Sequence, residues 1–174
     1  MNRMKRSILK RFVGGVLVFL AMPTITRADC FDDSAVRYSL NVDLLRSIAK
    51  NESNFNPNAI HWNTDGTHDI GIMQINSSNF VFLSRRGITE QMLYDKCLNI
   101  AVGAFFLAEA FHYYGDKWRA VGAYGAGMKA DKENARMIYA SRIQKLFEKA
   151  TDKLGVTQVA QATPPTNVSL AVWE

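Results

Sequence analysis

The segment Cys97-Leu-Asn-Ile-Ala-Val-Gly-Ala-Phe-Phe-Leu-Ala-Glu-Ala-Phe-His-Tyr-Tyr114 is apolar on almost every side when it is drawn as a helix. Its polar exceptions are Asn99, Glu109 and His112. A helix that is apolar all round has to be covered by other elements, so this segment predicts a central, buried helix. We therefore expect a mainly α fold built around residues 97–114.

Shorter elements are expected before the central helix. The Asp-Asp-Ser run at residues 32–34 predicts the cap of a helix through Leu40, because such side chains accept hydrogen bonds from free backbone N–H groups. Asn41 predicts the cap of a second helix, which ends at about Glu52. The Asn-, Pro- and Gly-containing stretch that follows predicts a loop with a small β-hairpin near residues 58–72.

Two helices are expected after the central one, at residues 118–126 and 131–154. The second is amphipathic, and residues that recur at every third or fourth position predict its buried face: Ala135, Ile138, Arg142, Leu146 and Ala150. Residues 155–174 contain Pro164-Pro165 and no apolar period, so they predict a flexible C-terminal tail.

Residues 1–28 have the pattern of a secretory signal peptide. A basic stretch through Arg11 precedes the apolar run at residues 12–22, and a small-residue site ends at Ala28. A membrane-spanning helix needs about 20 apolar residues, so the pattern favours cleavage after Ala28 over a retained N-terminal anchor. Asp29 before Cys30 argues against a lipoprotein. We expect an exported protein with no stable membrane insertion after signal removal, and a folded domain at residues 29–154.

Export changes the interpretation of the two cysteines, Cys30 and Cys97. An oxidising compartment lets a cysteine pair persist as a disulfide, and these are the only two cysteines in the chain. A disulfide between them would tie the N-terminus of the mature chain to the start of the central helix. A catalytic cysteine is the alternative, but Cys30 follows the cleavage site too closely to lie well in a pocket.

The net charge of +5 does not indicate a nucleic-acid-binding protein. Six of the 21 basic residues and none of the 16 acidic residues lie in residues 1–28. The rest of the chain is therefore close to neutral and lacks the basic surface that binding to phosphate backbones needs. We expect no nucleic-acid partner.

Glu52 lies at the end of the predicted second helix, on its apolar side. Leu44, Ile48 and Glu52 are four positions apart, and Leu45 and Ala49 lie on the adjoining stripe. A carboxyl that is pushed towards a core loses solvation, which favours the protonated form and raises the pKa. A general acid that works near neutral pH needs a raised pKa. Helix spacing alone also allows a Glu at the rim of the core with its carboxyl in solvent.

A second motif, Asp69-Ile-Gly-Ile-Met-Gln-Ile-Asn76, follows the polar loop and precedes a helix capped by Asn76 or Ser77. Glu52-Ser53 lies upstream of it, and Ala123-Tyr-Gly-Ala-Gly127 and Tyr139-Ala-Ser-Arg-Ile143 lie downstream. This order resembles the signature of the goose-lysozyme-like lytic transglycosylases (SLT domain): Glu-Ser, Gly-Leu-Met-Gln-Ile, Ala-Tyr-Asn-Ala-Gly, and a Tyr in the last long helix. The resemblance covers about residues 29–150.

The resemblance implies a lysozyme-like helical fold with a groove for a glycan strand and a single catalytic acid at Glu52. It implies cleavage of the β-1,4 bond between N-acetylmuramic acid and N-acetylglucosamine in peptidoglycan. The acid protonates the glycosidic oxygen, and the same carboxylate then takes the proton of the muramic C6 hydroxyl. The C6 oxygen closes on C1, so one carboxyl gives a 1,6-anhydro product without water, where ordinary glycosidases use two.

Matching positions imply further site residues. Ser53 and Gln74 match residues that line the groove and bond sugar or backbone, and Met73 matches the residue that packs beneath the sugar. Tyr124 and Tyr139 match the tyrosines around the catalytic carboxyl. Plain core packing is the alternative for Met73, Tyr124 and Tyr139.

Gly125 is a departure from the family pattern, which has Asn at this position. A glycine supplies no side-chain amide. The contact that the Asn makes in the family must therefore be lost, moved, or made by water in this chain.

Asp69 stands 17 positions after Glu52 and could face the same groove. A second carboxylate there would stabilise an oxocarbenium-like transition state, as in lysozyme; the alternative is an Asp that caps a helix or bonds a loop. His61, Asp65, His68 and Asp69 match no strong zinc or calcium pattern. We expect neither a metal nor a cofactor.

More narrowly, a small exported domain with these two cysteines resembles the specialised enzymes of type III secretion, conjugative type IV secretion and type IV pilus systems. This implies a periplasmic enzyme that opens peptidoglycan locally and is a component of an envelope-spanning machine. Two alternatives remain. One is a hydrolytic muramidase with the same fold, and the other is a non-catalytic module that binds glycan or secretion components.

Overall fold

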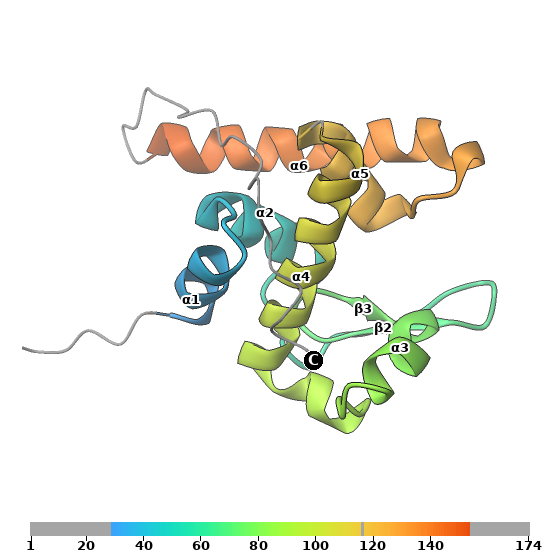
Figure 1. Cartoon of the computed structure of the whole chain (residues 1–174). Helices are drawn as coiled ribbons and strands as arrows, with labels where there is room; N and C mark the ends of the chain where they lie inside the picture. Colours follow the sequence, from blue (N-terminus) through green and yellow to red (C-terminus); the bar gives the residue numbers. More distant parts are fainter. Residues whose placement is uncertain (1–28, 116, 154–174) are drawn as a thin grey trace, which may run out of the picture.

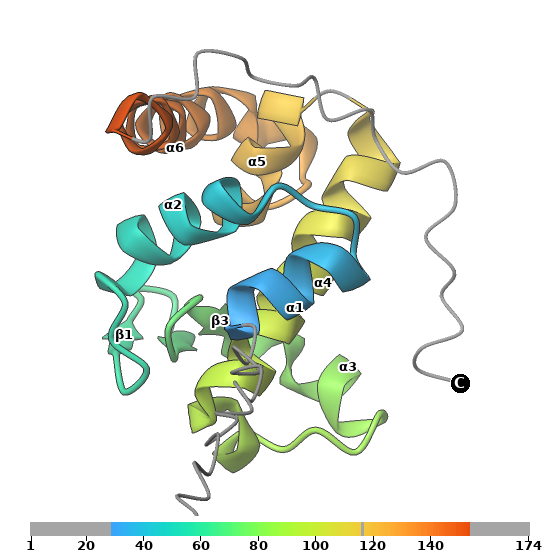
Figure 2. The same ribbon diagram turned by 90° about the vertical axis from the view of Figure 1, so that its left-hand side faces the viewer.

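Helix α4 (Lys96–Tyr114) runs through the middle of the molecule in the computed structural model, which describes residues 29–115 and 117–153. Helices α1 and α2 lie on one side of it, the small sheet and α3 lie on another, and α5 and α6 cross its C-terminal end (Figure 1, Figure 2). The predicted signal peptide and C-terminal tail lie outside the described residues. The other elements are α1 (Cys30–Arg37), α2 (Val42–Ser53), β1 (Ile60–Trp62), β2 (His68–Ile70), β3 (Ile75–Asn76), η1 (Ser77–Asn79), α3 (Phe80–Ser84), η2 (Gln91–Tyr94), α5 (Lys117–Ala126), η3 (Ala130–Lys132) and α6 (Glu133–Lys153).

The central helix confirms the prediction from its apolar sequence. Asp95 caps its N-terminus by accepting a hydrogen bond from the backbone N–H of Leu98 at 2.8 Å. Its buried side chains lie on most of its circumference, and they include the polar Asn99. The helix ends at Gly115, whose φ of 63° is in the left-handed region.

Helix α1 differs from its prediction, whereas α2 agrees with it. Asp29 caps α1 by accepting from the N–H of Phe31, so the helix begins before residues 32–34 and ends before Leu40. Asp32 lies inside the first turn of the helix and is not its cap, and its carboxylate pairs with Arg46 of α2 at 3.1 Å. Asn41 caps α2 as predicted and accepts from two backbone N–H groups.

The predicted disulfide is present and joins α1 to α4. Cys30 and Cys97 are bonded, with their Cα atoms 5.1 Å apart. Since α1 also packs against α2, the bond fixes the N-terminal side of the domain to its central helix.

The hairpin predicted near residues 58–72 is present and is part of a larger sheet. Strands β1 and β2 pair antiparallel, with Ile60 opposite Ile70. A third strand, β3, pairs antiparallel with β2 and was not expected from the sequence. It is only two residues long, Ile75 and Asn76, which is too short to give an alternating pattern.

The predicted buried face of α6 is wrong in the N-terminal half of the helix. Ala135, Ile138 and Arg142 are exposed, and Ile138 retains 55% of its accessible surface, whereas Leu146 and Ala150 of the same stripe are half-buried. The stripe next to it is buried instead, because that stripe packs against α5 and α2. Its members are Arg136, Tyr139, Ala140, Ile143 and Phe147.

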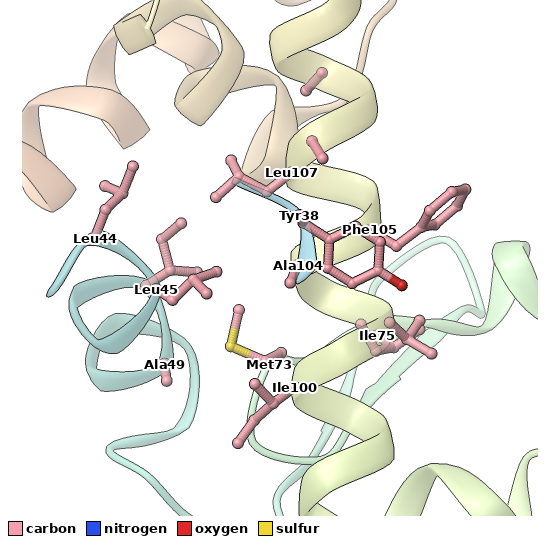
Figure 3. Packing of buried hydrophobic residues seen from close by; sticks show 14 of the residues in the cluster. Tyr38, Leu44, Leu45, Ala49, Met73, Ile75, Ile100, Ala104, Phe105 and Leu107 are labelled. Atoms are coloured by element: carbon pink, nitrogen blue, oxygen red, sulfur yellow. The ribbon is translucent and has the colours of Figure 1, made fainter. Parts of the chain in front are cut away.

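The part of the core beneath the groove lies between α2, α4 and the motif at residues 69–76. Figure 3 shows Met73 between the side chains of α2 and those of α4, close to Leu45 and Ile100. Met73, Leu45 and Ile100 are all fully buried.

Within the described ranges, no helix combines the length and apolar character that crossing a membrane requires.

Candidate active site

A groove with a volume of about 910 Å³ lies among α2, the hairpin, α4, α5 and α6. Several residues that the sequence singled out line it together: Glu52, Asp69, Gln74, Tyr124, Gly125 and Tyr139. The side that α6 contributes includes Ala135, Ile138 and Arg142. The stripe that was predicted to be buried therefore forms part of the groove wall.

Glu52 projects from the last turn of α2 and is partly buried. One carboxylate oxygen accepts hydrogen bonds from the Tyr139 hydroxyl and from the Asn51 amide. Burial raises the pKa of Glu52, and the nearby charge of Asp69 adds to this effect. The two hydrogen bonds and the charge of Arg142 lower the pKa but do not cancel the rise. The carboxyl thus keeps its proton to higher pH than an ordinary Glu, as a general acid requires.

Tyr139 is the closest partner of Glu52 and is 5% exposed. Burial and the neighbouring Glu52 charge raise the pKa of its phenol. The phenol therefore stays protonated and donates to the carboxylate. The guanidinium of Arg142, one turn further along α6, lies 5.6 Å from the centre of the Tyr139 ring.

Tyr124 donates its hydroxyl to the backbone carbonyl of Met73 at 2.7 Å. Burial raises the pKa of this phenol well above its usual value, and the charge of Glu52 raises it further. Tyr124 is therefore a neutral donor that lies near Glu52 but bonds the 69–76 motif. Its hydroxyl also fixes α5 against that motif.

Ser53 and Met73 support the groove floor and are not among its lining residues. The Ser53 hydroxyl donates to the carbonyl of Ile72 at 2.8 Å, which is a bond to backbone. The Met73 side chain has no exposed surface and packs in the core. In this conformation neither side chain reaches the groove, so any effect on substrate acts through the backbone of the motif.

Gln74 does line the groove, and its side-chain amide bonds the backbone. Its nitrogen donates to the carbonyl of Gly71 at 2.9 Å and to that of Ala59 at 3.3 Å. Its backbone φ of 50° lies in the left-handed region, which a non-glycine residue adopts rarely. The residue thus connects the turn at Gly71 to the loop before β1.

Asn99 is a site-supporting residue to which the sequence analysis assigned no role. Its side-chain oxygen accepts from the N–H of Met73 at 2.8 Å, and its nitrogen donates to the carbonyls of Ile70 and Leu93 at 3.1 and 2.8 Å. A Cβ at Gly71 would lie 2.0 Å from the Asn99 nitrogen, so only glycine allows this approach. The sequence did contain an indication of this role, because an amide that is buried in an apolar helix needs hydrogen-bond partners.

Asp69 faces the groove and bonds loops at the same time. One carboxylate oxygen accepts from the Asn76 amide at 2.8 Å, and the other accepts from the Asn63 amide at 2.9 Å. These bonds hold the carboxylate in the groove, where its charge raises the pKa of Glu52. The loop-bonding alternative is therefore observed, and the role of a second catalytic carboxylate stays a prediction.

His68 and Asp65 of the hairpin each bond another side chain. His68 pairs with Glu90 at 3.0 Å, and Asp65 accepts from Thr67. Among the residues that the structure places, no three His, Cys, Asp or Glu side chains form a group that could hold a metal ion.

A family model described as the transglycosylase SLT domain matches residues 29–147. The chain therefore belongs to the transglycosylase SLT domain family, and it is a lytic transglycosylase with a lysozyme-like fold.

The individual relatives agree with this family. Protein IpgF of Shigella flexneri is 40% identical over 140 residues, which cover 80% of this chain and 91% of that protein. Invasion protein IagB of Salmonella typhimurium (strain SL1344) is 37% identical over 135 residues, covering 77% and 84%. A solved structure, an inactive mutant of the lytic transglycosylase Slt from Pseudomonas aeruginosa, has a similar fold with a TM-score of 0.58 at 22% identity. The match covers 78% of this chain and 25% of that one.

Proposed function

We propose that this chain cleaves the β-1,4 bond between N-acetylmuramic acid and N-acetylglucosamine in peptidoglycan, with Glu52 as both acid and base. The observation that carries the proposal is the position of Glu52 in the groove, partly buried, hydrogen-bonded to Tyr139 and with a raised pKa. A single carboxyl in this state can supply a proton near neutral pH and take one back in the next step.

In the first step, the protonated Glu52 donates its proton to the glycosidic oxygen and the bond from that oxygen to C1 breaks. Positive charge develops at C1 of the muramic acid. In the second step, the Glu52 carboxylate takes the proton of the C6 hydroxyl and the C6 oxygen bonds C1. The product is a 1,6-anhydro sugar, Glu52 is again protonated, and no water is consumed.

Tyr139 and Asp69 assist this cycle in different ways. The Tyr139 hydroxyl donates to Glu52 and stabilises the carboxylate that forms after the first step. Asp69 supplies a negative charge near the developing positive charge. Its two amide bonds hold it in place, which favours this electrostatic role over that of a base that activates water.

Gln74 and the groove wall on α6 bind the glycan strand in this proposal. Ser53 and Tyr124 act indirectly, because their hydroxyls hold the backbone carbonyls of residues 72 and 73 in position. Met73 acts indirectly through its packing in the core. No cofactor enters the reaction.

We further propose that the enzyme acts in the periplasm and opens the wall locally for a secretion, conjugation or pilus apparatus. The support is the similarity to a protein named an invasion protein, over 77% of this chain. The signal-peptide pattern of residues 1–28 supports export.

Digestion of purified peptidoglycan followed by mass analysis of the products tests the chemistry. A lytic transglycosylase gives muropeptides that end in 1,6-anhydro-N-acetylmuramic acid and lack one water. A muramidase gives products with a free reducing end, and a non-catalytic module gives no new ends. We expect anhydro ends in the wild-type digest. Reducing ends alone, or no cleavage, would overturn the proposal.

A further inference from the structure

The backbone of Gly125 packs directly against the ring of Tyr139, and no space is left for a side chain at position 125. A Cβ built on Gly125 would lie 2.1 and 2.2 Å from two ring carbons of Tyr139 and 2.5 Å from the carbon that bears the hydroxyl. Non-bonded carbon atoms pack at about 3.5–4.0 Å. The ring therefore occupies the space in which any other residue at position 125 would place its side chain.

The contact between Gly125 and Tyr139 joins α5 to α6 beside the Glu52 carboxyl. Gly125 lies near the end of α5, Tyr139 lies in α6, and both line the groove next to Glu52. Tyr139 is nearly buried, so its ring has little space to move away while the hydroxyl stays on the carboxylate. A side chain at position 125 would force the ring to shift.

We propose that Gly125 is a positioning residue: its bare backbone provides the space in which the Tyr139 ring lies so that the phenol donates to Glu52. In this chain the hydrogen bond between Tyr139 and Glu52 then depends on the glycine at position 125.

The inference rests on the proposed role of Glu52, but its main readout does not depend on activity. Three titratable or charged side chains shift the pKa of Glu52: Asp69 of β2, and Tyr139 and Arg142 of α6. Tyr124 of α5 also faces Glu52, whose charge raises the pKa of the Tyr124 phenol. The Tyr139 hydroxyl lowers the pKa of Glu52. A shift of the ring that breaks this hydrogen bond should raise the pKa further.

The experiment compares Gly125→Ala, Tyr139→Phe and the double variant with the wild type. The pKa of Glu52 is measured by carboxyl carbon NMR titration of the folded protein, and the alkaline limb of the pH–rate profile is measured beside it. Gly125→Ala should raise the pKa of Glu52, and move the alkaline limb to higher pH, by as much as Tyr139→Phe does. The double variant should show no further shift, because each single substitution already removes the same hydrogen bond from Tyr139 to Glu52.

Gly122→Ala is the matched control in the same helix. The three atoms nearest to its Cβ would all belong to Arg136, with the backbone oxygen at 2.5 Å, so it disturbs the contact between α5 and α6 at Arg136 and not first at the Tyr139 ring. It should lower Tm and leave the pKa of Glu52 unchanged. An equal pKa shift in Gly122→Ala would assign the effect to general helix spacing and overturn the proposal.

The Tm of Gly125→Ala is a second readout, because the inference and a solvent-facing Gly125 predict changes of opposite sign. Alanine is a better helix former than glycine, so Gly125→Ala should raise Tm if position 125 only faces solvent. We expect Tm to fall because the ring must move. A stabilised Gly125→Ala with an unchanged Glu52 pKa would refute the inference, even if the enzyme cleaves peptidoglycan as proposed.

Discussion

Arg142 supplies a positive charge that lowers the pKa of the nearby Glu52 carboxyl. Arg142→Gln removes that charge, so the pKa of Glu52 should rise. Cleavage needs protonated Glu52, and the rate should therefore fall at a higher pH than in the wild type. The alkaline limb of a pH–rate profile measures this shift, and Lys149→Gln, two turns along the same helix and outside the groove lining, should leave it in place. An alkaline limb that moves to lower pH in Arg142→Gln would contradict the assigned effect of Arg142 on Glu52.

Asp69 is expected to act both in stability and in catalysis. Asp69→Asn keeps the shape, removes the negative charge and weakens one of two amide hydrogen bonds. We expect kcat to fall with little change in KM, because charge stabilisation acts chiefly at the transition state. We also expect the free energy of unfolding to fall by about 1 kcal/mol.

Turnover and Tm measured on one preparation of Asp69→Asn separate these two effects. Unchanged turnover per folded molecule would leave Glu52 as the sole catalytic carboxyl. Asp69 would then be a residue that bonds the hairpin.

Single residues were predictable where a motif fixed their position. The family resemblance predicted Glu52 and Tyr139 in one groove and left open whether Asp69 faces it, and all three line the groove in the structure. The motifs did not show which atoms each side chain bonds, because that depends on tertiary geometry. Ser53 and Tyr124 thus proved to bond backbone carbonyls.

Asn99 connects the central helix to the motif that forms the groove floor. Asn99→Asp replaces its amide donor with a carboxylate oxygen that faces two backbone carbonyls. An unpaired buried polar group costs about 1–3 kcal/mol, and more when it is charged. We therefore expect the free energy of unfolding to fall by at least about 2 kcal/mol, measured by urea denaturation at pH 7.

Asn134→Asp, at an exposed position in the first turn of α6, serves as the control for the loss of an amide. It should be neutral or slightly stabilising, because a negative charge is favourable at a helix N-terminus. Equal stability of Asn99→Asp and the wild type would show that the three hydrogen bonds of Asn99 do not support the motif.

Helices were easier to predict than their contacts. The type and approximate range of α2, α4 and α5 followed from caps and apolar content, since these are local properties. The buried face of α6 did not, because Ala135, Ile138 and Arg142 form a regular stripe that faces the groove. A surface that binds a ligand resembles a core face in sequence, and periodicity cannot distinguish the two.

At the scale of the whole molecule, export and the disulfide are linked. If residues 1–28 are a cleaved signal, protein made in a Gram-negative host should be recovered from the periplasm with Asp29 as its first residue. Non-reducing peptide mapping should find Cys30 joined to Cys97. In the chain-entropy model a bond across 67 residues stabilises the fold by about 4 kcal/mol, so reduction should lower Tm. Intact residues 1–28 together with free thiols would contradict this account.

Replacing Glu52 should leave the fold intact. Its pKa is raised in the folded protein, so the folded state binds this proton more tightly than the unfolded state, and the charged form destabilises the fold at higher pH. Glu52→Gln removes the free-energy cost of the partly buried, charged carboxylate. We expect its Tm at pH 7 to equal or exceed that of the wild type, with the difference shrinking as the pH falls towards the usual range of Glu.

The turnover of Glu52→Gln on purified peptidoglycan tests the central claim most directly. The amide keeps the shape of the side chain but cannot donate the proton, so the rate of release of anhydro-muropeptides should fall by at least about 10²-fold. Glu148→Gln, an exposed carboxyl on α6, should cleave at the wild-type rate. If folded Glu52→Gln keeps more than about a tenth of wild-type turnover, where loss of a general acid costs far more, Glu52 is not the acid.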